Sequence, residues 1–378
     1  MKLNKCKLGD IITQRREKYN GDSLPICGVT REGFIPPKQK EADTSLYNVF
    51  YEKDFVFNPA RMELNSIVYN DVYKKAICSS LYEVFYVNRP DIVLPEFLAL
   101  IVKQNWFTRY CEFLGSGSAR EYCRVANISQ IEINYPNIEI QKKIVNEYRI
   151  IKERIQIKKQ INDNLANTEQ AILVETISKN QTEPTVLGDL VDFIDGDRGK
   201  NYPTFDEFTS TGYCLFLNAS NVTSTGFNFD TCMFVTEEKD KLMNKGHLSP
   251  YDIVLTSRGT LGNVALYDKH IKYENVRINS GMLIIRPKSK QISPYFIYAL
   301  LKSSYMRAAI ERFKSGSAQP QLPIKDLQKI TFEIPQSDAV LADLDRQFLS
   351  IEESISINNK EIDNLKELSA VLLAELSC

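Results

Sequence analysis

Histidine and cysteine are two residue types that often carry chemistry in proteins, and in this sequence histidine is rare and the cysteines are dispersed. Its two histidines, His247 and His270, lie 23 positions apart, which suggests neither a duplicated metal site nor a paired acid–base apparatus. The eight cysteines are scattered singly, without the close pairs of a zinc site or the dense spacing of a disulfide framework. We therefore expect reduced, buried thiols, histidines on the surface or in loops, and no metal in this chain.

Motifs for phosphate binding and methyl transfer are also missing. GDRGKNYP, which starts at Gly196, is basic and contains glycine but lacks the spacing of a P-loop, and no G-x-G-x-x-G motif opens a helix after a strand. NPAR, which starts at Asn58, is not the Asn-Pro-Pro-aromatic motif of an amino-methyltransferase. The sequence thus predicts a chain that is not an enzyme and has no cofactor of its own.

The bulk properties are those of a globular protein. The chain has 378 residues, of which 43% are apolar, enough for about two or three domains. No segment approaches the roughly 18–20 consecutive apolar residues of a membrane span, and the N-terminus has no apolar run of signal-peptide length. We expect a cytoplasmic protein.

An internal repeat is the dominant feature of the sequence. Similar short motifs recur in the same order at an offset that only rises, from 179 to 199: LGD at positions 8 and 187, VTREGF and VTSTGF at 29 and 222, an arginine at 61 and 258, and SGSA at 116 and 315. Chance matches would scatter. A rising offset indicates a duplicated domain whose second copy carries inserted residues, chiefly around positions 204–215.

Each copy is followed by about 40 residues that contain neither glycine nor proline, which predicts long helices over residues 137–180 and 337–378. Asn137 and Ser337 are plausible N-caps. Seam residues then recur at alternating spacings of three and four, as in a coiled coil. The predicted seam contains Ile144, Tyr148, Ile151, Ile155, Lys158 and Leu165 in the first helix, and Leu344, Phe348, Ile351, Ile355, Asn358, Ile362 and Leu365 in the second.

Charge predicts that the two helices pair with each other. Residues 137–180 carry 8 basic and 6 acidic side chains, whereas residues 337–378 carry 3 basic and 9 acidic ones. Opposite net charges favour pairing. An antiparallel coiled coil would bring Lys158 and Asn162 close to Asn358 and so fix the register. The alternative is that each helix packs only on its own domain, but a helix of ~60 Å outruns a single domain.

The predicted fold is α+β, with two mixed α/β globular copies at residues 1–136 and 181–336. We call these the first copy and the second copy, and expect a pseudo-twofold axis to relate them and the two helices to join them. Runs such as SLYEVFYV and GMLIIRP predict strands, and residues 95–113 and 294–313 have helical periodicity. Antiparallel or mixed sheets fit better than a doubly wound sheet, because strands and helices do not alternate regularly.

In the order of its motifs the sequence resembles the specificity subunits of type I restriction–modification systems, which have two target-recognition domains and two helical regions. The resemblance covers essentially the whole chain and rests on the LGD starts, the SGSA loops, and the segments IEINYPNIEIQKKIV and ITFEIPQSDAVLADL that lead into the helices. It implies that each copy reads one half of a split site in double-stranded DNA. It also implies that the helices act as a spacer and as the docking surface for two modification subunits.

Further partners follow from the same resemblance. It implies that the modification subunits bind S-adenosylmethionine and methylate adenine, and that separate restriction subunits translocate and cleave DNA. This chain would then hold no cofactor and catalyse neither reaction.

Polar residues in loops that differ between the copies are the candidate DNA contacts, because such side chains bond to base edges and phosphates. Arg61 and Arg258 are candidate guanine readers, although each could instead brace its own loop. The lysines that follow a turn in the first copy, and the lysine and arginine in the corresponding region of the second, are candidate phosphate contacts, with a solvated face as the alternative. The remaining candidates in the set are Lys74, Lys75, Arg120, Arg124, Arg198, Lys200, Lys272, Arg277, Gln319 and Gln321.

Net charge fits an autonomous DNA binder poorly. The chain has a formal net charge of −1, with 18 basic and 16 acidic residues in the first copy and 18 basic and 17 acidic residues in the second. We therefore expect tight binding only when partner subunits add phosphate contacts. Two alternatives stay open: a two-fold adaptor that binds protein partners without DNA, and a standalone nuclease or methyltransferase with an unrecognised site.

Overall fold

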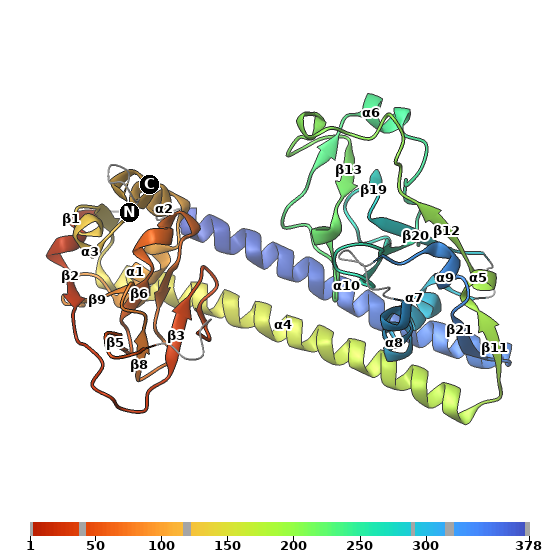
Figure 1. The fold of residues 1–378 in the computed structure, drawn as a ribbon, viewed down its shortest axis with the longest axis horizontal. Helices are drawn as coiled ribbons and strands as arrows, with labels where there is room; N and C mark the ends of the chain where they lie inside the picture. Colours follow the sequence, from red (N-terminus) through yellow and green to blue (C-terminus); the bar gives the residue numbers. More distant parts are fainter. Residues whose placement is uncertain (1–2, 38–42, 116–121, 289–291, 314–320, 375–378) are drawn as a thin grey trace. The chain divides into compact units, whose positions relative to one another are not determined.

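A computed structural model describes residues 3–37, 43–115, 122–288, 292–313 and 321–374 (Figure 1). The chain divides into two compact units, Met1–Gln156 with Asp363–Cys378, and Ile157–Ile362. Each unit holds one globular copy and one end of each long helix. Among the described helices, none is long and apolar enough to cross a membrane.

Two four-stranded sheets and a strand pair make up the first copy. One sheet is antiparallel throughout and has the order β2 (Ile12–Arg15), β9 (Glu83–Val87), β6 (Phe55–Phe57), β7 (Ile67–Tyr69). The other has the order β4 (Phe34–Ile35), β3 (Ile26–Val29), β8 (Lys75–Cys78), β5 (Asn48–Tyr51), and its β3–β8 pair is parallel. The pair joins β1 (Asn4–Lys7) to β10 (Glu132–Tyr135).

The second copy repeats this topology. Its antiparallel sheet has the order β12 (Val191–Asp195), β20 (Met282–Pro287), β17 (Ile253–Thr256), β18 (Val264–Leu266). Its other sheet has the order β16 (Phe234–Val235), β13 (Cys214–Leu217), β19 (Val276–Ile278), again with a parallel pair, β13–β19. Strand pairs join β11 (Thr182–Val186) to β21 (Thr331–Pro335), and β14 (Val222–Thr223) to β15 (Gly226–Phe227).

The two LGD motifs show the duplication at the level of single hydrogen bonds. In the first copy the N–H of Gly9 donates to the carbonyl of Ser129 at 3.0 Å, and in the second the N–H of Gly188 donates to the carbonyl of Gln328 at 3.0 Å. A Cβ on either glycine would lie 3.0 Å from that same oxygen, so both backbones approach too closely for a larger residue. Matching topology and matching hydrogen bonds confirm the predicted duplication.

Each predicted helical region of a copy contains two helices. Residues 95–113 fall in α1 (Pro95–Val102) and α2 (Asn105–Gly115), and residues 294–313 in α7 (Pro294–Lys302) and α8 (Ser304–Phe313). The shorter helical segments are η1 (Leu8–Asp10), η2 (Pro59–Leu64), α3 (Val125–Ile128), α5 (Leu187–Leu190), η3 (Phe205–Glu207), η4 (Ala219–Asn221), α6 (Glu237–Leu242) and α9 (Ile324–Leu327).

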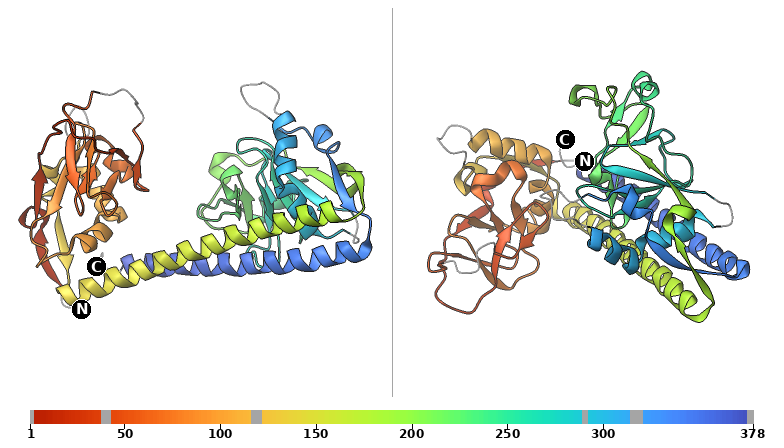
Figure 2. Two further views of the ribbon diagram at one scale, coloured as in Figure 1. Left: turned by 90° about the horizontal axis from the view of Figure 1, so that it is seen from below. Right: turned by 45° about the vertical axis from the view of Figure 1, so that its right-hand side comes forward.

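The long helices are α4 (Ile138–Lys179) and α10 (Asp338–Ala374), and Asn137 caps α4 by accepting from the N–H of Ile140 at 3.0 Å. In the second unit their facing segments run antiparallel, side by side (Figure 2). Lys158 Nζ donates to Asn358 Oδ1 at 2.9 Å, and Asn358 Nδ2 donates to Asn162 Oδ1 at 2.8 Å. The predicted register is therefore confirmed, and every predicted seam residue is buried or half-buried.

The helices attach to each copy by different chemistry. In the first unit the buried amide of Gln141, near the start of α4, accepts from the N–H of Leu94 at 2.9 Å and donates to the carbonyl of Ile92 at 2.9 Å. In the second unit Lys302 of α7 makes ion pairs with Glu169 of α4 at 2.6 Å and Glu352 of α10 at 2.5 Å. A buried neutral amide thus anchors the first copy, whereas a lysine shared by two buried glutamates anchors the second.

Candidate nucleic-acid interface

Three of the predicted DNA contacts converge at one end of the antiparallel sheet of the second copy, around the turn formed by residues 279–281. Arg198 donates to the carbonyl of Ser280 at 3.2 Å, and the N–H of Arg258 donates to the carbonyl of Gly281 at 3.1 Å. Arg258 also forms an antiparallel β-bridge with Gln321. We call Arg198, Arg258, Ser280 and Gln321 the second-copy edge. Its side chains come from four separate segments of the sequence.

The loop that carries Arg198 has a fixed shape. A Cβ at Gly196 would lie 2.2 Å from the carbonyl oxygen of Asn279, so the loop can approach the turn only with glycine there. The carboxylate of Asp197 accepts from the N–H of Gly199 at 2.7 Å, and this hydrogen bond is the main cause that lowers the pKa of the carboxyl. Asp197 was not among the predicted site residues, although an aspartate between glycines is typical of such side-chain-capped turns.

Arg258 lies on a loop with two glycines in the left-handed region, Gly259 at φ 74° and Gly262 at φ 82°. The hydroxyl of Thr256 closes this loop by donating to the carbonyl of Thr260 and accepting from the N–H of Asn263 at 3.0 Å. A half-buried arginine on such a braced loop loses little conformational freedom when it binds, which suits recognition of a guanine edge.

The first copy brings two predicted arginines to the corresponding place. The N–H of Cys123 donates to the carbonyl of Pro59 at 3.0 Å, which joins the segment of Arg124 to η2, where Arg61 lies. Both side chains are exposed, and Arg124 lies 3.5 Å from Glu83. We call Arg61 and Arg124 the first-copy edge.

The residue of the first copy that matches Arg258 depends on the strand from which the residues are counted. Counted forward from β6 and β17, whose Phe55 and Ile253 occupy the same place, Arg258 matches Ala60. Counted backward from β7 and β18, it matches Arg61, because the loop of the first copy is one residue longer.

Three predicted lysines lie away from these edges. Lys75 is the first residue of β8, at the opposite end of the strand from the β8–β9 turn, and it pairs with Asp22 at 3.4 Å. Lys74 precedes it and is exposed. Lys272, which precedes β19, is exposed and lies 5.3 Å from the ring centre of Tyr273. Arg120 and Gln319 lie outside the described residues, and Lys200 is exposed on the Gly196 loop.

Arg277 differs from its predicted place on the surface, because it is buried, with 6% of its area exposed. Its guanidinium pairs with the carboxylate of Asp240 and donates to the carbonyls of Lys245 at 2.7 Å and Met243 at 3.0 Å. These bonds occupy the guanidinium inside the protein, so we remove Arg277 from the set of DNA contacts.

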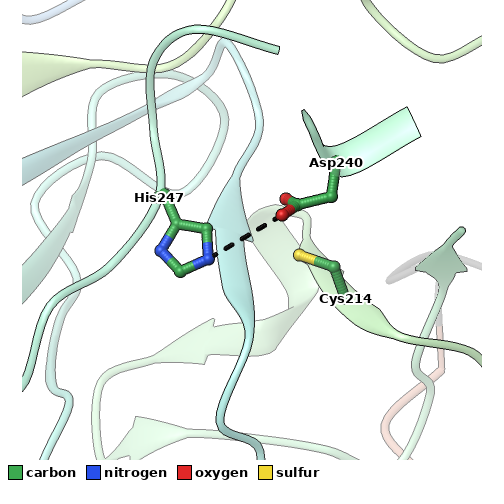
Figure 3. A group of neighbouring side chains, drawn as sticks. All are labelled: Cys214, Asp240 and His247. Carbon is green, nitrogen blue, oxygen red and sulfur yellow. Dashed lines mark ion pairs between the residues drawn. The ribbon is translucent and has the colours of Figure 1, made fainter. Parts of the chain in front are cut away.

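A group of possible metal ligands lies beside Arg277. Cys214, Asp240 and His247 have ligand atoms within 4.8 Å of one another, and His247 Nε2 lies 4.0 Å from Asp240 Oδ2 (Figure 3). Burial and the charge of Asp240 raise the pKa of the Cys214 thiol, which opposes the thiolate that a metal needs. The guanidinium on Asp240 would also repel a cation. The donor set therefore does not fit a metal: Cys214 and Asp240 are buried in the interior, and His247 lies in a loop with 38% of its side chain exposed.

Exposed aliphatic side chains follow the long helices. In the second unit Ile157, Ile161 and Ile357 are 54%, 40% and 58% exposed. Ile157 and Ile161 share a face of α4, and the Asn162–Asn358 hydrogen bond places Ile161 and Ile357 at the same level of the pair. In the first unit Ile150, Leu368 and Val371 are exposed as well. Exposed aliphatic residues in groups indicate a surface for other proteins.

Comparisons with known proteins agree with this architecture. The family model for the type I restriction modification DNA specificity domain matches residues 6–167 and again residues 181–367. The MjaIX specificity subunit of Methanocaldococcus jannaschii is 22% identical over 308 residues, 76% of this chain and 69% of that protein. The HindI specificity subunit of Haemophilus influenzae is 30% identical over 92 residues, 23% of this chain and 20% of that protein.

A solved structure has the same fold. The S subunit of a type I restriction–modification system from M. genitalium aligns with a TM-score of 0.57 and 18% identity, over 99% of this chain and 96% of that one. The family model covers most of this sequence in two successive matches, one for each copy with its helix. The chain therefore belongs to the type I restriction–modification DNA specificity family, as a non-catalytic specificity subunit with two recognition domains joined by long helices.

Proposed function

We propose that each copy reads one half of a bipartite DNA site through its edge. One observation carries this proposal: the same hydrogen-bonded scaffold presents different polar side chains at the same sheet end in the two copies. Arg61 and Arg124 lie there in the first, and Arg198, Arg258 and Gln321 in the second. A duplicated scaffold with divergent loops supports recognition of two different sequences.

The edge residues have different roles in this proposal. Arg61 and Arg258 read guanine, because an arginine can bond the O6 and N7 atoms of that base together. Arg124, Arg198 and Lys200 contact phosphates or base edges beside them, with Gln321 as a second reader. The lysines away from the edges, Lys74, Lys75 and Lys272, contact flanking phosphates. Arg120 and Gln319, which lie outside the described residues, are also proposed to contact DNA.

The helices serve the partner subunits in this proposal. Two modification subunits dock on α4 and α10 through the exposed aliphatic groups, which include Ile157, Ile161 and Ile357. These partners bind S-adenosylmethionine and methylate adenine, and restriction subunits join the same cytoplasmic complex. The partners also supply phosphate contacts, because the two copies carry almost balanced charge.

The test begins with the genome of the source organism. Methylated adenines mapped with and without this gene should reveal one split sequence that depends on it. The complex of the full chain with its modification subunits is then titrated with that duplex. Arg258→Ala should weaken binding by about 1–3 kcal/mol and relax specificity in one half-site, and Arg61→Ala should do so in the other. Unchanged methylation, or both variants acting on the same half, would refute the proposal.

The same titration separates the alternatives. A salt-sensitive, sequence-selective shift of the duplex excludes an adaptor that binds only proteins. Methyl transfer or DNA cleavage by the purified chain alone would instead support a standalone enzyme.

A further inference from the structure

Arg277 joins β19 to a segment that lies more than 30 residues earlier in the chain. Besides its ion pair with Asp240, the guanidinium donates to three carbonyls, those of Asp240 at 2.9 Å, Met243 at 3.0 Å and Lys245 at 2.7 Å. One buried side chain therefore fixes the backbone of residues 240–245, a segment that begins within α6. Figure 3 shows Asp240 of this segment, beside Cys214 and His247.

Residues 240–245 in turn hold the loop that carries Arg198. The carboxylate of Asp197 accepts from the N–H groups of Asn244 at 2.8 Å and Lys245 at 3.4 Å through one oxygen, and from Gly199 at 2.7 Å through the other. Asn201 adds a second tie, because its amide donates to the carbonyl of Leu242 at 2.8 Å. The hydrogen bonds thus run without a gap from Arg277, through residues 240–245 and Asp197, to the loop of Arg198 and Lys200.

We propose that Arg277 and Asp197 are positioning residues for DNA recognition by the second copy, which hold Arg198 and Lys200 in the geometry that contacts DNA. The inference rests on the proposed function, since it assigns a role within the second-copy edge. A loop that is already ordered loses less entropy when it binds, so the arginine and lysine bind more tightly on a fixed loop than on a free one.

A purely structural role explains Arg277 less well. Val49 of β5 pairs with Ile77 of β8, and His247, which precedes Ile253 by as many residues as Val49 precedes Phe55, forms an antiparallel bridge with Arg277, so Arg277 occupies the place of Ile77 in the first copy. Ile77 is buried, with 1% exposed. The same strand position is therefore filled by an apolar side chain in the first copy, so the strand itself does not require an arginine there.

The test is a double-mutant cycle in the complex of the full chain with its modification subunits, titrated with a duplex that carries the methylation-mapped site. Asp197→Asn keeps Arg198 and Lys200 but weakens the hydrogen bonds that hold their loop. It should reduce affinity about tenfold, the effect of one charge-assisted hydrogen bond. Arg198→Ala with Lys200→Ala should reduce affinity further. Adding Asp197→Asn to that pair should cause no additional loss, because the loop then has nothing to position.

A matched control distinguishes positioning from general stability. Asp252 is also a buried carboxylate that pairs with an arginine, Arg286 at 2.7 Å, and accepts a backbone N–H, that of Ser249 at 2.7 Å. It precedes β17, at the opposite end of that strand from the second-copy edge. Asp252→Asn should lower the melting temperature but leave affinity and half-site specificity unchanged. Arg277→Lys should reproduce the binding loss of Asp197→Asn in the same half-site.

The outcomes separate this inference from the proposed function. If the wild-type complex does not select the mapped sequence, the proposed function itself fails. If it does select the sequence while Asp197→Asn binds like wild type, or while the losses of the cycle simply add, the positioning role is refuted. Should Arg277→Lys fail to fold, the Asp197 cycle still decides, because Asp197→Asn keeps the size of this buried side chain and one oxygen that can accept the N–H groups.

Discussion

At the scale of single residues, the cluster of Glu169, Lys302 and Glu352 links the stability of the chain to pH. Glu169 is completely buried and faces Lys302 and Glu352, with the ring of Tyr298 beneath the ammonium group at 4.3 Å. Burial, with a smaller contribution from the charge of Glu352, outweighs the opposing effect of Lys302 and raises the pKa of Glu169 to about 8. Two carboxylates share one ammonium, so the cluster is neutral when Glu169 keeps a proton.

This cluster predicts that stability falls as pH rises. An unfolded glutamate has a pKa of about 4.3, so between roughly pH 4.5 and pH 8 the folded chain holds a proton that the unfolded chain has lost. The free energy of unfolding should decrease across this window and level off above it. Glu169→Gln mimics the protonated side chain and should remove most of the decrease, as measured by urea unfolding at pH 5, 6.5 and 8.

Glu353→Gln is the control for this experiment, because Glu353 follows Glu352 of the cluster on α10 but pairs with Lys269 at 2.5 Å at the surface. Its lowered pKa places its titration below the window, so the slope from pH 5 to pH 8 should not change. An identical slope in wild type and Glu169→Gln would contradict the predicted protonation of Glu169.

Gly196 gives a second prediction at this scale. Alanine there would place its Cβ 2.2 Å from a backbone oxygen that cannot move aside, so Gly196→Ala should destabilise the chain by about 3 kcal/mol, measured by thermal unfolding. Gly199→Ala, in the same loop, meets only the Asp197 side chain at 3.1 Å and should cost less than half as much. Equal costs would mean that the close approach at Asn279 does not matter.

At the scale of secondary-structure elements, the long helices were predictable and the burial of Arg277 was not. The helices were predicted over residues 137–180 and 337–378, and α4 spans 138–179, because a seam without glycine or proline is a local signal. The division of residues 294–313 was missed, since helical periodicity continues across the break, where the hydroxyl of Ser303 accepts from the N–H of Met306. Arg277 depends on Asp240, 37 residues away, and periodicity carries no signal for such a partner.

The polar layer of the helix pair predicts the effect of Asn358→Ala. This variant removes the donor to Asn162 Oδ1 and one acceptor of the Lys158 ammonium, which keeps its ion pair with Glu361 at 2.8 Å, and should lower the free energy of unfolding by about 1 kcal/mol in urea titrations. Asn164→Ala, at an exposed position of α4, should be nearly neutral. A neutral or stabilising effect of Asn358→Ala would show that the seam does not need this polar layer.

At the scale of the whole molecule, the proposed function makes the helix pair the spacer between half-sites. Removing one heptad from α4 and the facing heptad from α10 would shorten the pair by about 10 Å. The gap between the two halves of the methylated sequence should then shrink by about three base pairs at ~3.4 Å each. Adenine methylation mapped across a genome that carries the shortened gene measures the gap directly. An unaltered gap would exclude a ruler role for the helices.

The anchoring lysine of the second copy limits how specificity could be exchanged between relatives. Lys302 of the second copy occupies the same place as Lys103 of the first. Within the described part of the chain, Lys103 has no acidic partner of this kind, and it donates to the carbonyls of Arg31 at 2.8 Å and Ile67 at 2.6 Å. A chimaera that received only residues 181–336 from another subunit would keep Glu169 and Glu352, because these lie on its own α4 and α10. A transferred domain without a lysine at position 302 would bury Glu169 and Glu352 together with no counter-ion. The exchange must therefore include the helix residues that face position 302.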